Sequence, residues 1–292
     1  MAKHILEQVQ HGFVRVEKDG VAWYSAPSLL EAGVLHGLSA RGGGVSAAPA
    51  SLATLNLGWN RPDDAQNVQQ NYRRLAQAAG FAYHSMALVR YEHGNAVRYA
   101  TADDQGRGFA AEAFDAPCDG LIANSPALTM ITLHADCLPV FLYAPSTHTG
   151  AMLHAGWKGV VLGIGTQALS RMTQQLDCRA GEMLAAIGPG ISRRRFEVDL
   201  PVVARFEQAA LRWPDAQKEH WLDGPDERNK YFIDLPQLMA AQLTACGIPA
   251  GQITLADHCT YDNPQDFYSY RRDGKACGAM AGFLRVPEET HR

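Results

Sequence analysis

Cys137 and His154 are the residues of this chain whose types most readily support chemistry. Cys137 lies in the apolar run 131–140 and His154 in the glycine-flanked run 151–159. Both runs predict strands, and the small residues beside them would let a substrate approach the backbone. His93 adds a second imidazole upstream. A thiolate and two imidazoles together would form a His/Cys/His site for a transition metal.

The spacing of these three residues bears on the kind of metal site that they could form. His93 and His154 lie 44 and 17 residues from Cys137, which matches no zinc-finger spacing, so the fold would have to assemble the site. Three protein ligands leave a fourth position open, which is typical of a catalytic metal. Zinc there would act as a Lewis acid or lower the pKa of a bound water. An inert buried thiol remains the alternative for Cys137.

Copper is chemically compatible with two histidines and a cysteine. A multicopper oxidase, however, needs many more histidines, commonly as His-x-His pairs. None of the eleven histidines is two residues from another. The ligand count therefore disfavours a laccase.

The bulk composition is that of an ordinary soluble globular protein, with 47% hydrophobic and 19% charged residues. The net charge of -4 gives no general reason to bind nucleic acid or an anionic membrane. No stretch is long and apolar enough to span a membrane, and the N-terminus lacks the pattern of a signal peptide. Six scattered cysteines without a Cys-x-x-Cys pair predict a reduced, cytoplasmic location.

Helical and strand patterns alternate along the chain, which predicts an α/β protein. We expect a single domain over residues 1–292, with its core at about 21–286. Apolar periodicity predicts helices at 64–79, 160–176, 200–211 and 235–246. Strands are predicted at 21–25, 86–91, 120–123, 128–134, 140–143, 150–154, 183–187 and 231–233.

Pro139 lacks a ladder donor, so the strand carrying Cys137 should end, bulge or lie at an edge there. On a regular strand Cys137 shares a face with Ile131, while His134 points the other way. His134 is therefore not expected to bind the same ion as Cys137.

Three further segments have residues suited to holding a substrate. The glycine-rich segment 39–46 combines Ser39 and Arg41 with free backbone amides. These groups could bind an anion, or the segment could be only a mobile turn. Segment 186–192 could bring backbone amides against a ligand or be a rigid turn. Segment 267–274 places Tyr270 beside Arg271, which suits a base or a sugar phosphate, although surface strands share this pattern. Lys158 precedes a helix, where a lysine is more often a solvated charge than a catalytic residue.

Several phrases in order resemble the YfiH-type family, whose label as multicopper polyphenol oxidases or laccases is misleading and whose members include purine nucleoside phosphorylases. The phrases span residues 36 to 280, nearly the whole chain. They are His36-Gly-Leu-Ser-Ala-Arg-Gly-Gly-Gly-Val-Ser46, Leu55-Asn-Leu-Gly58, His93-Gly94, Ala135-Asp-Cys-Leu-Pro139, His154-Ala-Gly-Trp-Lys-Gly159, Ile187-Gly-Pro-Gly-Ile-Ser192 and Phe267-Tyr-Ser-Tyr-Arg-Arg-Asp-Gly274.

The resemblance implies a fold of layered mixed sheets flanked by helices, like that of cysteine hydrolases, with zinc held by the residues matching the triad above. It implies phosphorolysis of adenosine, inosine or guanosine to base and ribose 1-phosphate, with adenosine deamination and methylthioadenosine cleavage as further activities. The small-molecule partners would be a purine nucleoside and phosphate. The catalytic residues would be Cys137, His154 and Arg41, and the substrate would be bound by Ser39, Arg41, Asn56, Lys158, Tyr270 and Arg271.

The chain departs from the family's usual phrases at positions near the expected site. These are Tyr91-Glu92 for Gln-Val, His134 for Thr, Lys158 for Arg, Phe196 for Tyr, and Ala279 for Arg. The triad survives, but substrate choice is open. Glu92 could add a carboxylate to the site or face solvent.

Three other functions remain to be distinguished from phosphorolysis. One is a hydrolase that cleaves an amide in a UDP-muramoyl cell-wall precursor. Another uses Cys137 as a nucleophile and His154 as its base, because the fold resembles that of cysteine-dependent deamidating toxins. The last is a structural zinc protein, which would need a closed four-ligand site.

Overall fold

The computed structural model describes residues 5–47, 49–109 and 112–288. In this part of the chain the largest sheet has seven strands, in the order β1-β15-β11-β9-β10-β7-β6. The central strands are apolar and buried on both faces, as expected for a sheet covered on both sides. Their bounds are β1 Gln10–His11, β6 Val97–Tyr99, β7 Gly120–Ala123, β9 Leu138–Ala144, β10 Thr149–Ala155, β11 Leu184–Ile187 and β15 Ile253–Leu255.

A second sheet packs face to face on the first. Its order among the described residues is β2-β3-β4-β16-β8-β5. Gly150 and Gly282 mark the close approach, since a Cβ on Gly282 would lie 2.3 Å from Met152 Cε and one on Gly150 2.7 Å from Leu284 Cδ2. The bounds are β2 Val14–Lys18, β3 Val21–Ser25, β4 Leu35–Ser39, β5 Met86–Leu88, β8 Thr129–His134 and β16 Met280–Arg285.

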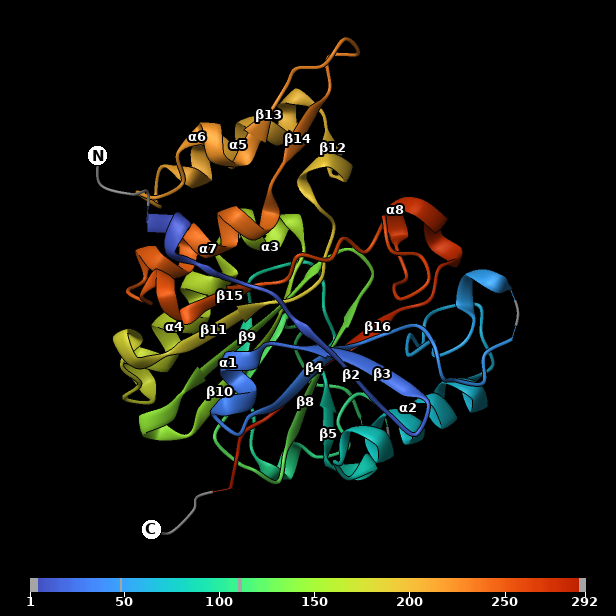
Figure 1. Cartoon of the computed structure of the whole chain (residues 1–292). Helices are drawn as coiled ribbons and strands as arrows, with labels where there is room; N and C mark the ends of the chain where they lie inside the picture. Colours follow the sequence, from blue (N-terminus) through green and yellow to red (C-terminus); the bar gives the residue numbers. More distant parts are fainter. Residues whose placement is uncertain (1–4, 48, 110–111, 289–292) are drawn as a thin grey trace.

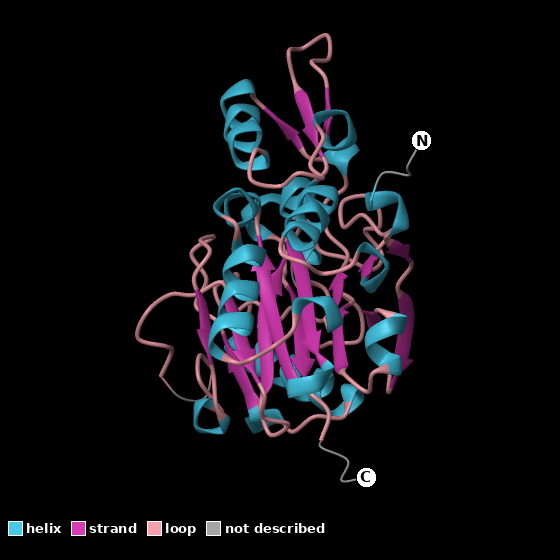
Figure 2. Ribbon diagram, turned by 90° about the vertical axis from the view of Figure 1, so that its left-hand side faces the viewer, coloured by secondary structure: helices cyan, strands magenta, loops and turns pink. Residues whose placement is uncertain are grey.

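Helices cover the outer faces of both sheets, which gives a helix–sheet–sheet–helix layering (Figures 1 and 2). The seven-stranded sheet is covered by α3 (Trp157–Leu162), α4 (Ile164–Gln175) and α7 (Leu235–Ala245), and α2 (Ala65–Ala79) covers the other sheet. Shorter helices are α1 (Pro27–Glu31) and α8 (Tyr270–Asp273). The predicted α/β class with layered mixed sheets is confirmed.

A small lobe at residues 197–233 stands above the helices at the top of Figure 1. It contains a sheet with the order β12-β14-β13 and the helices α5 and α6. Phe206 of α5 packs between Trp157 of α3 and Trp221, which attaches the lobe to the body. The bounds are β12 Glu197–Val198, α5 Leu200–Ala210, α6 Lys218–Trp221, β13 Leu222–Asp223 and β14 Tyr231–Ile233.

The prediction of one helix at 160–176 is wrong, because the structure has two helices there and the first begins earlier, at Trp157. Gly163 adopts a left-handed conformation with φ 83°, which ends α3 and separates it from α4. The predicted helices at 64–79, 200–211 and 235–246 are confirmed within two residues at each end. Asp64 caps α2 by accepting the Gln66 N–H at 2.8 Å.

The expectation for Cys137 on a regular strand is also corrected. Strand β8 ends at His134 and β9 begins at Leu138, with Asp136 between them at φ 91°. The alternation of faces therefore stops before Cys137, whose direction is set by a turn. The break that Pro139 predicted lies just before it, and Pro139 is tolerated in the first residues of the strand that follows.

The described residues contain no helix with the length and hydropathy needed to cross a bilayer.

His36 on β4 is buried between the two sheets. Its Nε2 accepts the Ala26 N–H at 2.9 Å, its Nδ1 lies 3.0 Å from the Val34 carbonyl, and its ring packs edge-on against Phe141. Burial lowers its pKa to about 4, although the hydrogen bond to Val34 opposes this effect. The imidazole is thus neutral in the folded protein at neutral pH.

We expect this burial to make the protein less stable in mild acid. The unfolded chain takes up a proton on His36 near pH 6.5 and the folded chain only near pH 4, so stability is lost as pH falls through this window, by about 3 kcal/mol at its lower end. Urea unfolding at pH 7 and pH 4.5 measures the loss. His36→Gln should show a smaller loss than the wild type, and an equal loss in both would contradict the prediction.

Candidate metal centre and active site

The predicted triad comes together at one end of the two sheets. His93 lies in the loop between β5 and β6, Cys137 in the turn from β8 to β9, and His154 near the end of β10. One ligand atom from each residue lies within 4.8 Å of the others. His154 is buried and His93 exposed, so the group is reached from the His93 side.

Asp119 holds two of these residues in place and was not predicted. It is fully buried directly before β7. Its carboxylate accepts the backbone N–H groups of His93 at 3.0 Å and Gly94 at 2.8 Å, and lies 2.9 Å from Nδ1 of His154. A carboxylate can only accept there, so Nδ1 of His154 carries the proton and Nε2 keeps its lone pair for a metal.

The electrostatics of the group favour a thiolate. Burial alone would raise the pKa of Cys137, but the charge of His154 and hydrogen bonds from His154 and His93 lower it to about 7. Burial works against protonation of His154, yet the Cys137 thiolate and Asp119 raise its pKa above the ordinary value. Without a metal, the pair is therefore stabilised as thiolate and imidazolium.

The donor set fits a metal ion with an open position. One thiolate and two imidazoles suit zinc or copper, and three protein ligands leave room for water or substrate. Asp119 supplies the carboxylate that commonly orients a ligand histidine from behind. Among the described residues, no fourth His, Cys, Asp or Glu joins the group.

His134 is buried beside the triad without joining it. Its Nδ1 lies 3.1 Å from the Cys137 carbonyl and its Nε2 lies 2.7 Å from the Thr132 hydroxyl. The carbonyl can only accept, so Nδ1–H donates to it and Thr132 donates to Nε2. Burial, followed by the charge of His154, lowers the pKa of His134 well below its usual range, so it is a neutral support for the turn.

Glu92 also lies outside the metal group. Its side chain is exposed, and its backbone N–H lies 3.3 Å from Asp119. Of the two alternatives for Glu92, the structure favours the solvent-facing one.

Gly156 provides the space in which the ligands meet. A Cβ at this position would lie 3.1 Å from Cys137 Sγ and 3.2 Å from His93 Cδ2. We expect Gly156→Ala to weaken metal affinity by about 10- to 100-fold, the range seen when the support of a metal ligand is disturbed. The backbone there is extended and accepts alanine, so stability should change little.

Titration of metal into the apoprotein tests this expectation, with Gly181→Ala as control because a Cβ there meets nothing within 4 Å. Equal metal affinities for the two variants would contradict it.

A cavity of about 740 Å³ opens beside the triad. Its lining includes the predicted residues Lys158, Tyr270 and Arg271, and also Phe196 and, from the lobe, Val202. Most departures from the family phrases line this cavity: Tyr91, His134, Lys158, Phe196 and Ala279. The departures thus concentrate where a substrate would be selected.

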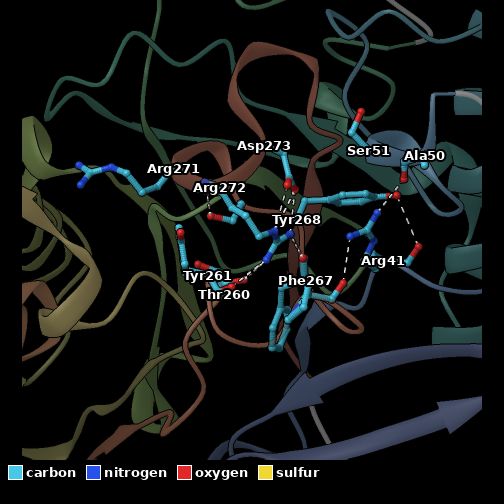
Figure 3. A network of polar contacts seen from close by, with 12 residues as sticks. Arg41, Ala50, Ser51, Thr260, Tyr261, Phe267, Tyr268, Arg271, Arg272 and Asp273 are labelled. Atoms are coloured by element: carbon cyan, nitrogen blue, oxygen red, sulfur yellow. Dashed lines mark hydrogen bonds and ion pairs between the residues drawn. The ribbon is translucent and has the colours of Figure 1, made fainter.

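Three other predicted site residues do not line this cavity, namely Arg41, Ser39 and Asn56. Arg41 donates to the carbonyls of Ala53, Pro264 and Ala50 at 2.9–3.0 Å and stacks on Tyr268 (Figure 3). Its guanidinium thus bonds two segments, at 50–53 and at Pro264. Arg271 extends away from this network in the same view.

Ser39 and Asn56 are fully buried and bound to the backbone. The Ser39 hydroxyl accepts the Ala281 N–H at 3.0 Å. Oδ1 of Asn56 accepts the N–H groups of Gly58 and Ala279, both at 3.0 Å. Both residues position the strand and loop that border the cavity.

Comparisons with known proteins agree with this geometry. The sequence model of the family described as multi-copper polyphenol oxidoreductase laccase matches residues 35–287. The purine nucleoside phosphorylase of Deinococcus radiodurans is 33% identical over 268 residues, 92% of this chain and 94% of that protein. Purine nucleoside phosphorylase YfiH of Escherichia coli is 32% identical, with 86% and 93% of the two chains covered.

Solved structures give the same result. The crystal structure of YlmD from Geobacillus stearothermophilus superposes with a TM-score of 0.85 at 28% identity, covering 95% of this chain and 100% of that one. Bacillus licheniformis hypothetical protein YfiH gives a TM-score of 0.84 at 27% identity, covering 94% and 99%. The resemblance to the YfiH-type family is confirmed.

Proposed function

Since this chain belongs to the multi-copper polyphenol oxidoreductase laccase family and its relatives carry the name purine nucleoside phosphorylase, we propose that it is a zinc-dependent purine nucleoside phosphorylase. The observation that carries the proposal is the His93–Cys137–His154 group, which opens on a cavity large enough for a nucleoside and phosphate. The substrates would be adenosine, inosine or guanosine, with adenosine deamination and methylthioadenosine cleavage as further activities.

Zinc is the metal that we assign to the triad. Zinc bound there would supply a Lewis acid that polarises a reacting oxygen, or would activate water in the deaminase reaction. A multicopper oxidase would need further copper sites, and within the described residues no second group of at least three metal-type ligands is found.

In phosphorolysis an oxygen of phosphate attacks C1′ of the ribose, and the bond from C1′ to the purine nitrogen breaks with its electron pair leaving on the base. Lys158 and Arg271 line the cavity and would contribute positive charge near the phosphate. Tyr270 and Trp157 would contact the flat face of the base and the ring of the ribose. Holding both substrates in one cavity is itself a large part of such catalysis.

A cysteine-dependent hydrolase is the second candidate, and one observation favours it. Cys137, His154 and Asp119 have the order of nucleophile, base and orienting carboxylate, and the pKa of Cys137 is lowered to about 7 by its charged and hydrogen-bonded neighbours despite burial. A thiolate that binds zinc is not a free nucleophile. Chelation should therefore raise the activity of such a hydrolase and abolish that of the phosphorylase.

The test is a product analysis on zinc-loaded protein with each purine nucleoside, with and without phosphate. We expect free base and ribose 1-phosphate only when phosphate is present. No product from any purine nucleoside would refute the proposal. Phosphate-independent release of an amino acid from a UDP-muramoyl substrate would instead indicate the amidase.

A further inference from the structure

Arg61 lines the same cavity but belongs to none of the sequence phrases that predicted the site. Its Nε is buried and has no hydrogen-bond partner. The guanidinium makes one hydrogen bond in the described structure, from Nη1 to the Lys275 carbonyl at 3.3 Å. The edge formed by Nε and Nη2 is therefore left without a partner. That edge is the fork with which an arginine binds an oxyanion through two parallel hydrogen bonds.

The loop that carries Arg61 is held firmly. Asn56 bonds this loop to Ala279 through the two contacts described above, and its Nδ2 donates to Asp63 at 2.8 Å. Gly58 allows the close approach, since a Cβ there would lie 2.8 Å from Arg61 Cγ and 3.1 Å from Ala279 Cβ. The stem of Arg61 thus passes beside the small side chain of Ala279, and its position is fixed before a ligand arrives.

The acids that line the cavity already have partners. The carboxylate of Asp136 accepts the Thr260 hydroxyl at 2.6 Å and the Arg271 N–H at 2.7 Å. Glu197 pairs with Arg228, and Asp199 pairs with Lys230. Arg61 has no carboxylate within 4.0 Å among the described residues. The wall of the cavity therefore presents a guanidinium without a carboxylate partner, and its buried Nε–H group, which has no hydrogen-bond acceptor, is costly.

We propose that Arg61 is the principal ligand of the phosphate co-substrate, which it binds through its Nε and Nη2 edge. The inference rests on the proposed phosphorolysis and deepens it. A purine nucleoside is uncharged, whereas phosphate carries a negative charge that would pair with the positive charge of the Arg61 guanidinium. Arg271 is less available because its Nη1 donates to the carbonyls of Arg195 and Glu197. Lys158 is a point charge whose amine lies 5.8 Å from the Trp157 ring.

The test compares Arg61→Gln, Arg61→Lys and the wild type as zinc-loaded proteins. Arg61→Gln should raise the KM for phosphate about 10- to 100-fold, the range for a lost charged hydrogen bond, and leave the KM for nucleoside within about twofold. Arg61→Lys should recover part of the phosphate affinity because it restores the charge without the fork. The matched control is Arg179→Gln, which removes a surface arginine paired with Glu182.

An unchanged KM for phosphate in Arg61→Gln, or an equal rise in the KM for nucleoside, would overturn the inference. Calorimetric titration of inorganic phosphate separates this failure from failure of the proposed function. If the wild type binds phosphate, Arg61→Gln binds it at least tenfold more weakly and neither forms ribose 1-phosphate, the anion site stands and phosphorolysis fails. If the wild type forms ribose 1-phosphate and both proteins bind phosphate equally, the role of Arg61 fails alone.

Discussion

Replacing Cys137 with alanine should remove bound zinc and lower phosphorolysis by at least ~10³-fold. The thiolate is one of only three ligands that the described structure offers, and a metal ion at a reacting oxygen contributes several kcal/mol to catalysis. The side chain is small and lies in a turn, so the fold should persist. Metal content and turnover, measured on the same preparation, check the result.

Cys178→Ala is the matched control, because this buried cysteine lies in the helix-side core, outside the triad. It should keep its zinc and its turnover. Full metal content in Cys137→Ala would show that the thiol is not a ligand. Lost turnover with retained metal would instead point to the nucleophilic role of Cys137.

Asp119→Asn should have the second largest effect. An asparagine NH₂ group at the Oδ1 position would face both the Nδ1 proton of His154 and the backbone N–H of His93, which disturbs two ligands at once. At the Oδ2 position it would face the backbone N–H groups of Gly94 and Glu92, which disturbs the loop that carries His93. We expect zinc affinity to fall by about 10- to 100-fold, with a parallel loss of activity at limiting zinc.

Asp115→Asn provides the comparison, since Asp115 is an exposed acid four residues away that pairs with Arg98. The decisive readout is the zinc dissociation constant, and saturating zinc should restore part of the activity of Asp119→Asn. An unchanged dissociation constant would contradict the positioning role of Asp119.

The triad could be predicted from the sequence because thiol and imidazole side chains are typical metal ligands. Asp119 gave a weaker signal, an acid directly before a predicted buried strand, and only the fold shows that it faces His154. The roles of Arg41 and Arg61, by contrast, could not be predicted from the sequence. Both follow or adjoin glycine-containing loops. Arg41 bonds three carbonyls and Arg61 only one, and this difference depends on contacts between residues far apart in the sequence, such as Arg41 with Pro264.

The fold was predictable where the local pattern and the long-range packing agree. Strand β7 and helix α2 were predicted nearly to the residue. Strand β4 was missed because it contains His36 and Gly37, which are poor strand signals. Its burial comes from pairing with β16 and from the facing sheet, neither of which is visible in a local window.

Phosphorolysis by this protein can be observed by ³¹P NMR of zinc-loaded protein incubated with adenosine and inorganic phosphate. We expect a growing sugar 1-phosphate signal that matches the adenine released, and no such signal in chelated protein or in Cys137→Ala. Release of adenine with no change in the phosphate signal, or equal formation of ribose 1-phosphate after zinc is removed, would contradict it.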